Sequence, residues 1–323
     1  MATVLVTSLG SVAADIIIKS LKRLGHKVVG CDIYPKEWVP DAFNVDIFYR
    51  APLASEAAAY LDFVEEVCER ENVAYVMPLT DVEVDVLNAN RRRYESRGIC
   101  FCMSPKETLE TCRNKKLLKE FIDENCVGIK TIPTVLLVEC ETSPWEYPVI
   151  VKPYDGRSSI GLRRVHDDLE WAALANIPDP ERYIVQPNIP GPIVMSELVR
   201  QPESGKVVVV VREELLETLN FCALAVRMYR DEELEERSRE LANALGIVGS
   251  VNFEWILDDA GEYHFVECNP RFSAGAEFTC MAGYDLITNH FACFAGGEVE
   301  DFHYRREMVI SRKYEEFLTK VEG

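Results

Sequence analysis

The order of the apolar segments is the feature that most constrains the fold of this chain. Over residues 1–104, short β-branched runs alternate with amphipathic helical stretches in single file. Strands separated by helices form parallel sheets, because a parallel connection needs a long crossover. From Pro148 onwards, strand-like runs dominate and short turns join them, which is typical of antiparallel hairpins. The sequence therefore predicts a parallel α/β module followed by an α+β module with antiparallel sheets.

The first module has a regular succession of predicted elements. Strands are expected at residues 4–7, 27–32, 73–77 and 99–102, and helices near 12–24, 56–70 and 82–94. Residues 33–55 are rich in Pro, Asp and Asn and are predicted to be a loop. The turn after the first strand holds a single glycine, Gly10, and lacks the Gly-x-Gly-x-x-Gly pattern. We therefore predict no dinucleotide site there.

The net charge excludes two classes of partner. The chain has 35 Lys and Arg against 54 Asp and Glu, so its formal charge is −19. Nucleic acids and anionic membranes attract proteins through an excess of basic residues, so neither is an expected partner. No apolar run approaches the roughly 20 residues of a membrane span, and the first residues are typical of a strand. A cytoplasmic location is therefore expected.

The cysteines do not form a recognisable framework. There are eleven of them, an odd number at irregular spacings without a Cys-x-x-Cys pair. Cysteines in such a pattern behave as small buried apolar residues with reduced thiols. We therefore expect neither a disulfide framework nor a cysteine metal site.

Two carboxylates lie on neighbouring predicted strands. The strands of Glu254 and Glu267 are joined by the turn at 258–262, so their pairing places the two side chains at a similar level. Adjacent carboxylates repel unless a cation lies between them. Asn269 adds an oxygen on the same face, and this set suits Mg²⁺, while Arg271 follows where a guanidinium can stabilise phosphoryl transfer. An ordinary hairpin with solvent-facing carboxylates explains the spacing equally well.

A lysine and a small-residue loop form a second candidate site. Lys152 follows the strand-like run at 149–151, and residues 156–161 read Gly-Arg-Ser-Ser-Ile-Gly. The backbone N–H groups and hydroxyls of such a loop can close over phosphates. The loop lacks the Gly-x-x-x-x-Gly-Lys-Ser/Thr pattern, and an ordinary loop between two strands is the alternative.

These motifs, in this order, resemble the ATP-grasp superfamily over most of the chain. The resemblance is greatest to its stand-alone members, which look like one ATP-binding half of the large subunit of carbamoyl-phosphate synthase. The matching motifs are Pro78-Leu79-Thr80-Asp81-Val82-Glu83, Asn114-Lys115, Val151-Lys152-Pro153, the loop at 156–161, the hinge at 183–191, Asn252-x-Glu254 and Glu267-Cys268-Asn269-Pro270-Arg271.

The resemblance implies a three-part chain. It implies a Rossmann-like pre-ATP-grasp domain at 1–104, a small lobe with the phosphate loop at 105–186, and a large lobe with the metal and catalytic residues at 187–323. It also implies ATP together with Mg²⁺ or Mn²⁺ as cofactors. In this scheme Arg271 is catalytic, and the metal ligands are Glu254, Glu267 and Asn269. The implied ATP contacts are Lys115, Lys152, Gly156, Ser158, Ser159, Gln186, Ile189 and Glu197.

The activity that the resemblance implies is ATP-dependent ligation. A small-molecule carboxylate is joined to an amine, or to a related nucleophile, through an acyl phosphate with release of ADP and phosphate. Homodimers are common in the family, so a homodimer is a candidate assembly. The candidate substrate contacts are Asp81, Glu83, Arg212, Gly10 and Ser11. Thr80 and Asp81 can equally cap the helix that follows them.

Two positions near the hinge differ from the family pattern. Pro187 stands where the family has Glu after the hinge Gln, and it removes one backbone N–H. Ile193 stands at the position of the family's ribose-binding Glu. Both departures favour an alternative function, an ATP-binding regulatory or sensor protein without ligase activity. The complete motif from Glu267 to Arg271 favours the ligase.

Overall fold

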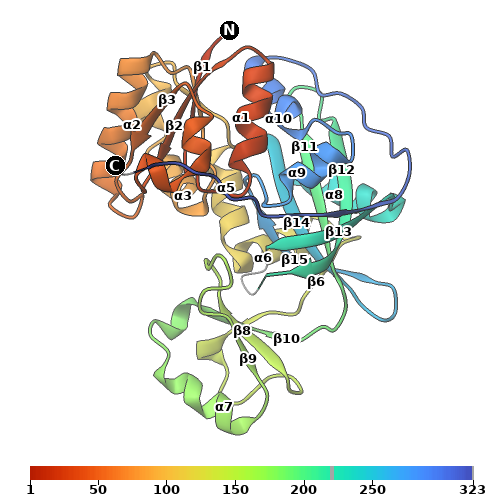
Figure 1. Ribbon diagram of the computed structural model, residues 1–323. Helices are drawn as coiled ribbons and strands as arrows, with labels where there is room; N and C mark the ends of the chain where they lie inside the picture. Colours follow the sequence, from red (N-terminus) through yellow and green to blue (C-terminus); the bar gives the residue numbers. More distant parts are fainter. Residues whose placement is uncertain (219–221, 322–323) are drawn as a thin grey trace.

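Three β-sheets organise the chain in the computed structural model, which describes residues 1–218 and 222–321. The first sheet is parallel, the second is antiparallel, and the third is antiparallel except for one edge strand. The N-terminal sheet and the large third sheet lie beside each other, and the small second sheet lies below them in Figure 1. This arrangement confirms the predicted fold class, a parallel α/β module followed by antiparallel sheets.

The N-terminal sheet has the order β3-β2-β1-β4-β5. Its elements are β1 (Thr3–Val6), α1 (Ala14–Arg23), β2 (Lys27–Asp32), η1 (Lys36–Trp38), η2 (Pro40–Phe43), β3 (Ile47–Arg50), α2 (Ala57–Glu71), β4 (Tyr75–Met77), α3 (Asp81–Ala89), α4 (Arg92–Glu95) and β5 (Cys100–Phe101). Strand β3 lies within the residues predicted to be a loop. The strand was not predicted because four residues are too few to show the alternation of a strand. The predicted helix at 82–94 is two helices that break near Asn90.

The small sheet has the order β7-β10-β8-β9. Its elements are β7 (Val135–Leu136), η3 (Leu137–Glu139), β8 (Val149–Pro153), β9 (Arg163–Val165), α7 (Asp168–Ala173), η4 (Leu174–Asn176), η5 (Pro180–Arg182) and β10 (Tyr183–Pro187). A separate apolar core fills this lobe, with Val149, Val151 and Val185 at its centre. Alternation along β8 therefore turns Lys152 away from that core.

The large sheet has the order β16-β13-β12-β11-β14-β15-β6. Its strands and the helices around it are α5 (Lys106–Arg113), α6 (Lys115–Asn125), β6 (Lys130–Thr131), β11 (Ile193–Arg200), β12 (Val207–Glu217), β13 (Ala223–Tyr229), α8 (Glu232–Ala244), β14 (Gly249–Leu257), β15 (Tyr263–Asn269), α9 (Ala276–Met281), α10 (Leu286–Ala295) and β16 (Met308–Ser311). Strand β6 comes from residues predicted to belong to the small lobe, yet it pairs with β15.

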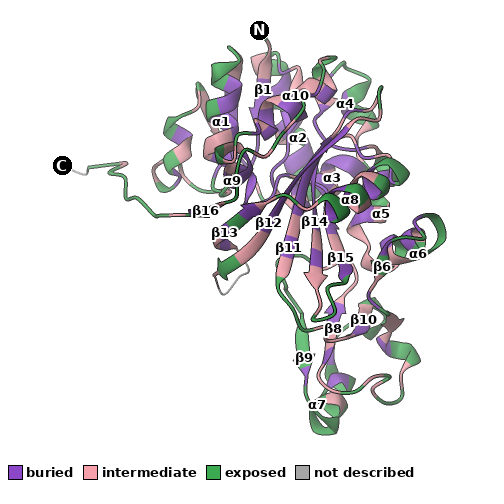
Figure 2. Cartoon of the chain, turned by 90° about the vertical axis from the view of Figure 1, so that its right-hand side faces the viewer, coloured by how far each residue is buried: buried purple, intermediate pink, exposed green. Residues whose placement is uncertain are grey.

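The two faces of the large sheet have different coverings. Val199 and Val210 share one core with residues of α1 and α10, so this face packs against the N-terminal domain. Val209 and Val251 point to the opposite face and share a second core with α6 and α8. Figure 2 shows the central strands of this sheet as largely buried. Because Glu254 and Val210 lie on the same face, the carboxylate pair faces the junction with the N-terminal domain.

The structure shows the state of the cysteines and the length of the helices. All eleven cysteines are free thiols, and none of them is exposed. Among residues 1–218 and 222–321, no group of three or more His, Cys, Asp or Glu side chains could hold a metal ion. No helix in this part of the chain is long and apolar enough to span a bilayer.

The turn that connects the small lobe to the large one requires glycine at position 191. The φ of Gly191 is +148°, and a Cβ there would lie 2.0 Å from the carbonyl oxygen of Leu257. We expect Gly191→Ala to lower the free energy of unfolding by about 3 kcal/mol, because the backbone must move. Gly261→Ala is the control, since Gly261 has φ +83° but no atom within 4 Å of such a Cβ. Its expected loss is about 1 kcal/mol, and equal losses in urea unfolding would contradict the prediction.

Candidate active site

Glu254 and Glu267 face each other across the pairing of β14 with β15, as the hairpin spacing predicts. The register pairs Glu254 with Glu267 and Asn252 with Asn269, and it shifts immediately after Glu254. Both glutamates are half-buried, and Asn269 Nδ2 donates a hydrogen bond to Glu267 Oε1 at 3.3 Å. Two carboxylates and an amide therefore lie together where the end of β15 pairs with the middle of β14.

The two carboxylates of this pair titrate differently. Burial, and then the negative charge of Glu267, raise the pKa of Glu254 to about 8, although Lys152 opposes the shift. Burial alone would also raise the pKa of Glu267. Lys115 and Lys152, with hydrogen bonds from Lys115 and Asn269, outweigh that effect and hold the pKa of Glu267 well below its usual range. At neutral pH Glu267 is therefore ionised, whereas Glu254 largely retains a proton.

Lys115 reaches Glu267 from the first turn of α6. The side chain of Asn114 caps this helix by accepting hydrogen bonds from two backbone N–H groups of the first turn. Lys115 Nζ lies 3.1 Å from Glu267 Oε2 and donates a hydrogen bond to the carbonyl oxygen of Gly156 at 2.9 Å. One ammonium group therefore connects the carboxylate pair to the predicted phosphate loop.

Lys152 approaches the same carboxylates from the small lobe. Its position on β8 is opposite Ile184 of β10, and the residue is only 8% exposed. Burial lowers the pKa of Lys152, Glu267 opposes the shift, and the positive charge of Lys115 adds to it. A buried ammonium group needs an anion beside it, so this site already favours negatively charged groups.

Arg271 connects the carboxylate pair with the N-terminal domain. Its Nη2 donates hydrogen bonds to Asn269 Oδ1 at 3.3 Å and to Asp81 Oδ2 at 3.0 Å. Its Nη1 donates to the carbonyl oxygen of Phe272 at 3.1 Å. Asp81 is the first residue of α3, which follows β4, so its carboxylate lies at the ligand-binding edge of the parallel sheet. The structure thus brings this predicted residue to the candidate catalytic arginine.

The other predicted nucleotide contacts lie on the small lobe or beside it. Ser158 and Ser159 are exposed in the loop after β8, with φ of +49° and +52°. Gln186 is buried near the end of β10, where its Nε2 donates a hydrogen bond to Thr134 Oγ1 at 2.8 Å. Ile189 is half-buried in the hinge. Their contacts with a nucleotide stay predictions.

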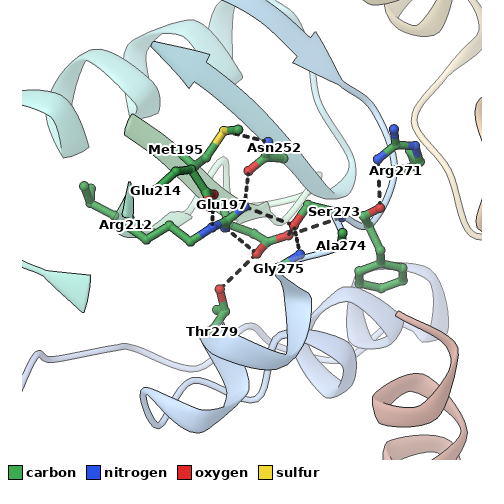
Figure 3. Close-up of polar contacts among 12 residues, drawn as sticks. Met195, Glu197, Arg212, Glu214, Asn252, Arg271, Ser273, Ala274, Gly275 and Thr279 are labelled. Carbon is green, nitrogen blue, oxygen red and sulfur yellow. Dashed lines mark hydrogen bonds and ion pairs between the residues drawn. The ribbon is translucent and has the colours of Figure 1, made fainter. Parts of the chain in front are cut away.

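Glu197 and Arg212 lie in a closed network inside the large lobe (Figure 3). Arg212 Nη1 lies 3.0 Å from Glu197 Oε2, and Arg212 Nε lies 2.9 Å from Glu214 Oε1. The hydroxyls of Ser273 and Thr279 donate to Glu197 at 2.7 and 2.9 Å. Both side chains are buried and paired with protein partners. The predicted ligand contacts of Glu197 and Arg212 stay predictions.

Gly275 completes the network, although the sequence analysis did not predict a role for it. A Cβ at this position would lie 2.6 Å from Arg212 Cζ, so only glycine allows the backbone this close to the guanidinium. Burial alone would lower the pKa of Arg212, but Glu197 and Glu214 raise it, which keeps the guanidinium charged. The signal in the sequence is the run of small residues, Ser273-Ala274-Gly275, directly after the motif that ends at Arg271.

Three further candidate substrate contacts lie within the N-terminal domain. Glu83 Oε2 accepts hydrogen bonds from the backbone N–H and the hydroxyl of Thr80, at 3.2 and 2.8 Å. Thr80 is the N-cap residue of α3, so Glu83 stabilises the helix start. Gly10 and Ser11 lie in the turn after β1, where the N–H of Gly10 donates to Asp32 Oδ2 at 2.7 Å. These contacts hold the turn and the helix end in place.

Two family models match parts of this chain. Residues 180–317 match the family model described as "ATP-grasp in the biosynthetic pathway with Ter operon". Residues 4–102 match the model "PylC-like, N-terminal domain". The chain therefore carries an ATP-grasp domain that follows a PylC-like N-terminal domain. The resemblance seen in the sequence motifs is thereby confirmed.

Similar proteins include ATP-grasp ligases of different sizes. The chain is 24% identical over 286 residues to 3-methyl-D-ornithine–L-lysine ligase of Methanosarcina barkeri, covering 86% of this chain and 70% of that protein. It is 23% identical over 291 residues to the carbamoyl phosphate synthase large chain of Methanobrevibacter smithii, covering 83% of this chain. The ATP-grasp chain spans only 27% of the length of that synthase chain.

A solved structure has the same fold over nearly the whole chain. The biotin carboxylase domain of 2-oxoglutarate carboxylase from Hydrogenobacter thermophilus matches with a TM-score of 0.77 at 18% identity. The match covers 95% of this chain and 73% of that chain. At this level of identity the likeness concerns the ATP-grasp fold.

The Arg212 network gives a prediction about stability. We expect Arg212→Met to lower the free energy of unfolding by about 3–5 kcal/mol, because Glu197 and Glu214 would keep buried charge without their partner. The control is Lys19→Met, which removes an exposed ion pair with Asp15 within α1 and should cost less than about 0.5 kcal/mol. Urea unfolding measures both changes. An Arg212→Met protein as stable as the wild type would show that the network does not support the fold.

Proposed function

We propose that this chain is an ADP-forming ligase that uses ATP to activate a small-molecule carboxylate and joins it to an amine or a related nucleophile. The observation that carries the proposal is the convergence of two lysines on the pair Glu254–Glu267, with Asn269 beside it. Carboxylates that can hold a metal ion, next to cations that attract phosphates, suit the binding of a nucleoside triphosphate.

Mg²⁺ or Mn²⁺ fits the oxygen set of Glu254, Glu267 and Asn269. Burial and the neighbouring carboxylate raise the pKa of Glu254 to about 8, as expected where positive charge is insufficient for both groups to ionise. Hard divalent cations prefer a few carboxylate and carbonyl oxygens together with phosphate oxygens. When bound there, the ion would neutralise phosphate charge and polarise the phosphoryl oxygens.

The relatives support the same chemistry. The biotin carboxylase domain was crystallised with MgADP, ADP and bicarbonate, and as a dimer. The Methanosarcina relative is named as a ligase of 3-methyl-D-ornithine and L-lysine. By analogy, ATP and Mg²⁺ are the proposed cofactors of this chain, and a homodimer stays a prediction.

Each proposed step has a task for residues of this chain. In the first step a substrate carboxylate oxygen attacks the γ-phosphorus of ATP, and the bond between this phosphorus and the β–γ bridging oxygen breaks. The products are an acyl phosphate and ADP. Lys115 and Lys152 would neutralise the phosphates, and Arg271 would stabilise the transferring phosphoryl group. The loop at 156–161 would exclude water. In the second step the amine attacks the acyl carbon, phosphate leaves, and the amine loses a proton.

An ATP-binding regulatory protein without ligase activity is the second candidate. Two departures from the family pattern favour it, Pro187 at the end of β10 and Ile193 at the start of β11. Neither residue offers the polar group that the family has at its position. Such a protein would bind ATP but would not release ADP in response to a carboxylate.

ADP release separates the two candidates. With Mg²⁺ present, we expect the wild type to release ADP for one combination in a carboxylate panel crossed with an amine panel. Glu267→Gln should lower that rate about 100-fold or more with unchanged unfolding, because the site loses its ionised carboxylate. Glu262→Gln, an exposed position in the same hairpin, is the control. ATP binding without ADP release across the panel would favour the regulatory candidate, and an undiminished rate in Glu267→Gln would contradict the assigned site.

The pKa of Glu254 predicts a pH dependence of metal binding. A carboxyl with a pKa of about 8 is mostly protonated below pH 8, so a metal ion must displace that proton there but not above it. We therefore expect Mn²⁺ affinity, without nucleotide, to rise more than about tenfold between pH 6.5 and 8.5. Glu254→Gln should bind Mn²⁺ more weakly and without this rise. Electron paramagnetic resonance of free Mn²⁺ measures both, and a flat wild-type profile would contradict the prediction.

A further inference from the structure

Asp81 and Arg271 meet at the junction of the N-terminal domain and the large lobe. They are separated by 190 residues in the chain, and their hydrogen bond is 3.0 Å long. The side chain of Asp81 is 5% exposed, and that of Arg271 is 20% exposed. We propose that Asp81 is a positioning residue that holds the guanidinium of Arg271 in the orientation needed for phosphoryl transfer. The proposal rests on the proposed ligase function, and it assigns Asp81 a task other than direct contact with the substrate.

The start of α3 fixes the carboxylate of Asp81. Thr80 is the N-cap residue, and Glu83 binds both its backbone N–H and its hydroxyl. Tyr60 OH donates a hydrogen bond to the other oxygen of Glu83 at 3.0 Å, which ties α3 to α2. A carboxylate in the first turn of a helix also interacts favourably with the helix dipole. Asp81 is therefore a rigidly supported anion that faces Arg271.

A second arginine balances the charge of Asp81 without competing for Arg271. Arg113, at the end of α5, binds Asp85 through Nε at 2.9 Å and Nη2 at 3.1 Å. Its Nη1 lies 3.6 Å from Asp81 Oδ1, which is an ion pair but not a hydrogen bond. Asp81 Oδ1 is buried and has no hydrogen-bond partner in the part of the chain that the structure describes. The hydrogen bond of this carboxylate is therefore directed to Arg271 through Oδ2.

The other acceptors of Arg271 are neutral. One is the carbonyl oxygen of Phe272 at 3.1 Å, and the other is Asn269 Oδ1 at 3.3 Å. Asn269 also belongs to the proposed metal-ligand set. Within residues 1–218 and 222–321, Asp81 is the only anion in hydrogen-bond contact with Arg271. Charge-assisted hydrogen bonds are about twice as strong as neutral ones, so loss of Asp81 should free the guanidinium to turn.

A continuous series of polar contacts extends from Asp81 to the phosphate loop. Its successive contacts measure 3.0, 3.3, 3.3, 3.1 and 2.9 Å. In order, it connects Asp81, Arg271, Asn269, Glu267, Lys115 and the carbonyl oxygen of Gly156. A shift of Arg271 would therefore disturb the amide that supports the carboxylate pair. The main effect is expected on the chemical step, because Arg271 would contact the transferring phosphoryl group, whereas Lys115 lies three contacts further along the series.

Two substitutions of Asp81 test the proposal in the full-length protein. Asp81→Asn keeps an oxygen acceptor and loses the charge, whereas Asp81→Ala loses both. We expect kcat for ADP release to fall about tenfold in the first variant and about 100-fold in the second, with KM for ATP changed by less than about threefold. Asp85→Asn is the control, because Asp85 lies on the same helix and binds Arg113 but not Arg271. Its kcat should stay within about twofold of the wild type.

A double-mutant cycle shows whether Asp81 acts through Arg271. In an Arg271→Gln background, measured in single-turnover assays, Asp81→Ala should cause no further loss of rate. A further loss equal to that in the wild-type background would overturn the proposal, since Asp81 would then act on the fold or on the substrate directly. A fall in kcat that is accompanied by a comparable rise in KM for ATP in the single variants would also overturn it.

A second measurement does not depend on catalysis. Hindered rotation of the Arg271 guanidinium gives separate Nη signals in ¹⁵N-edited NMR, assigned by their loss in Arg271→Gln. We expect these signals in the wild type and in Asp85→Asn, and their merging in Asp81→Ala. If the wild type releases no ADP but the signals behave in this way, the proposed function fails and the positioning of Arg271 stands. Unchanged signals in Asp81→Ala would overturn the positioning role whatever the activity.

Discussion

Two carboxylates on adjacent strands impose the main electrostatic constraint on this structure. Glu254 and Glu267 are directly paired in the large sheet, where partial burial strengthens their repulsion. Lys115 and Lys152 offset part of it, and they come from α6 and from the small lobe. The small lobe must therefore present β8 to this edge of the large sheet. Apolar cores hold each lobe together, and the two lysines meet the carboxylate pair where the lobes adjoin.

The large sheet holds two kinds of buried charge on one face. Arg212 is paired with Glu197 and Glu214 and donates to the Ser273 hydroxyl, so its charge and most of its donors are satisfied within the protein. On the same face, burial raises the pKa of Glu254, and it lowers the pKa of Lys152, which reaches Glu254 from β8 of the small lobe; neither group has enough opposite charge nearby to offset its burial. A satisfied network stabilises a fold, whereas a perturbed one marks a place where a ligand can supply the missing charge.

Local features of this fold could be predicted from the sequence, and tertiary ones could not. The facing of Glu254 and Glu267 follows from a five-residue turn between two strands, which fixes the register over a short distance. The contact of Asp81 with Arg271 joins parts of the chain 190 residues apart, so no spacing indicates it. The burial of Glu197 depends likewise on α9, which supplies Thr279. Family motifs give residue types at positions, but they do not say which oxygens are already occupied.

The acidity of the chain does not oppose an anionic ligand, because the acidic residues act over short distances. Many surface acids pair with a basic residue one helical turn away, as Glu233 does with Arg237, and charges further apart than about 8 Å are largely screened at physiological salt. The net charge of −19 suggests that the acidic residues repel an anionic ligand. Inside the site, an acidic residue instead helps a lysine to stay positively charged. Burial, together with the positive charge of Lys115, lowers the pKa of Lys152, so without an anion nearby Lys152 would lose its proton more readily. Glu267 raises the pKa of Lys152, and an acidic residue thereby keeps positive charge where phosphates would bind.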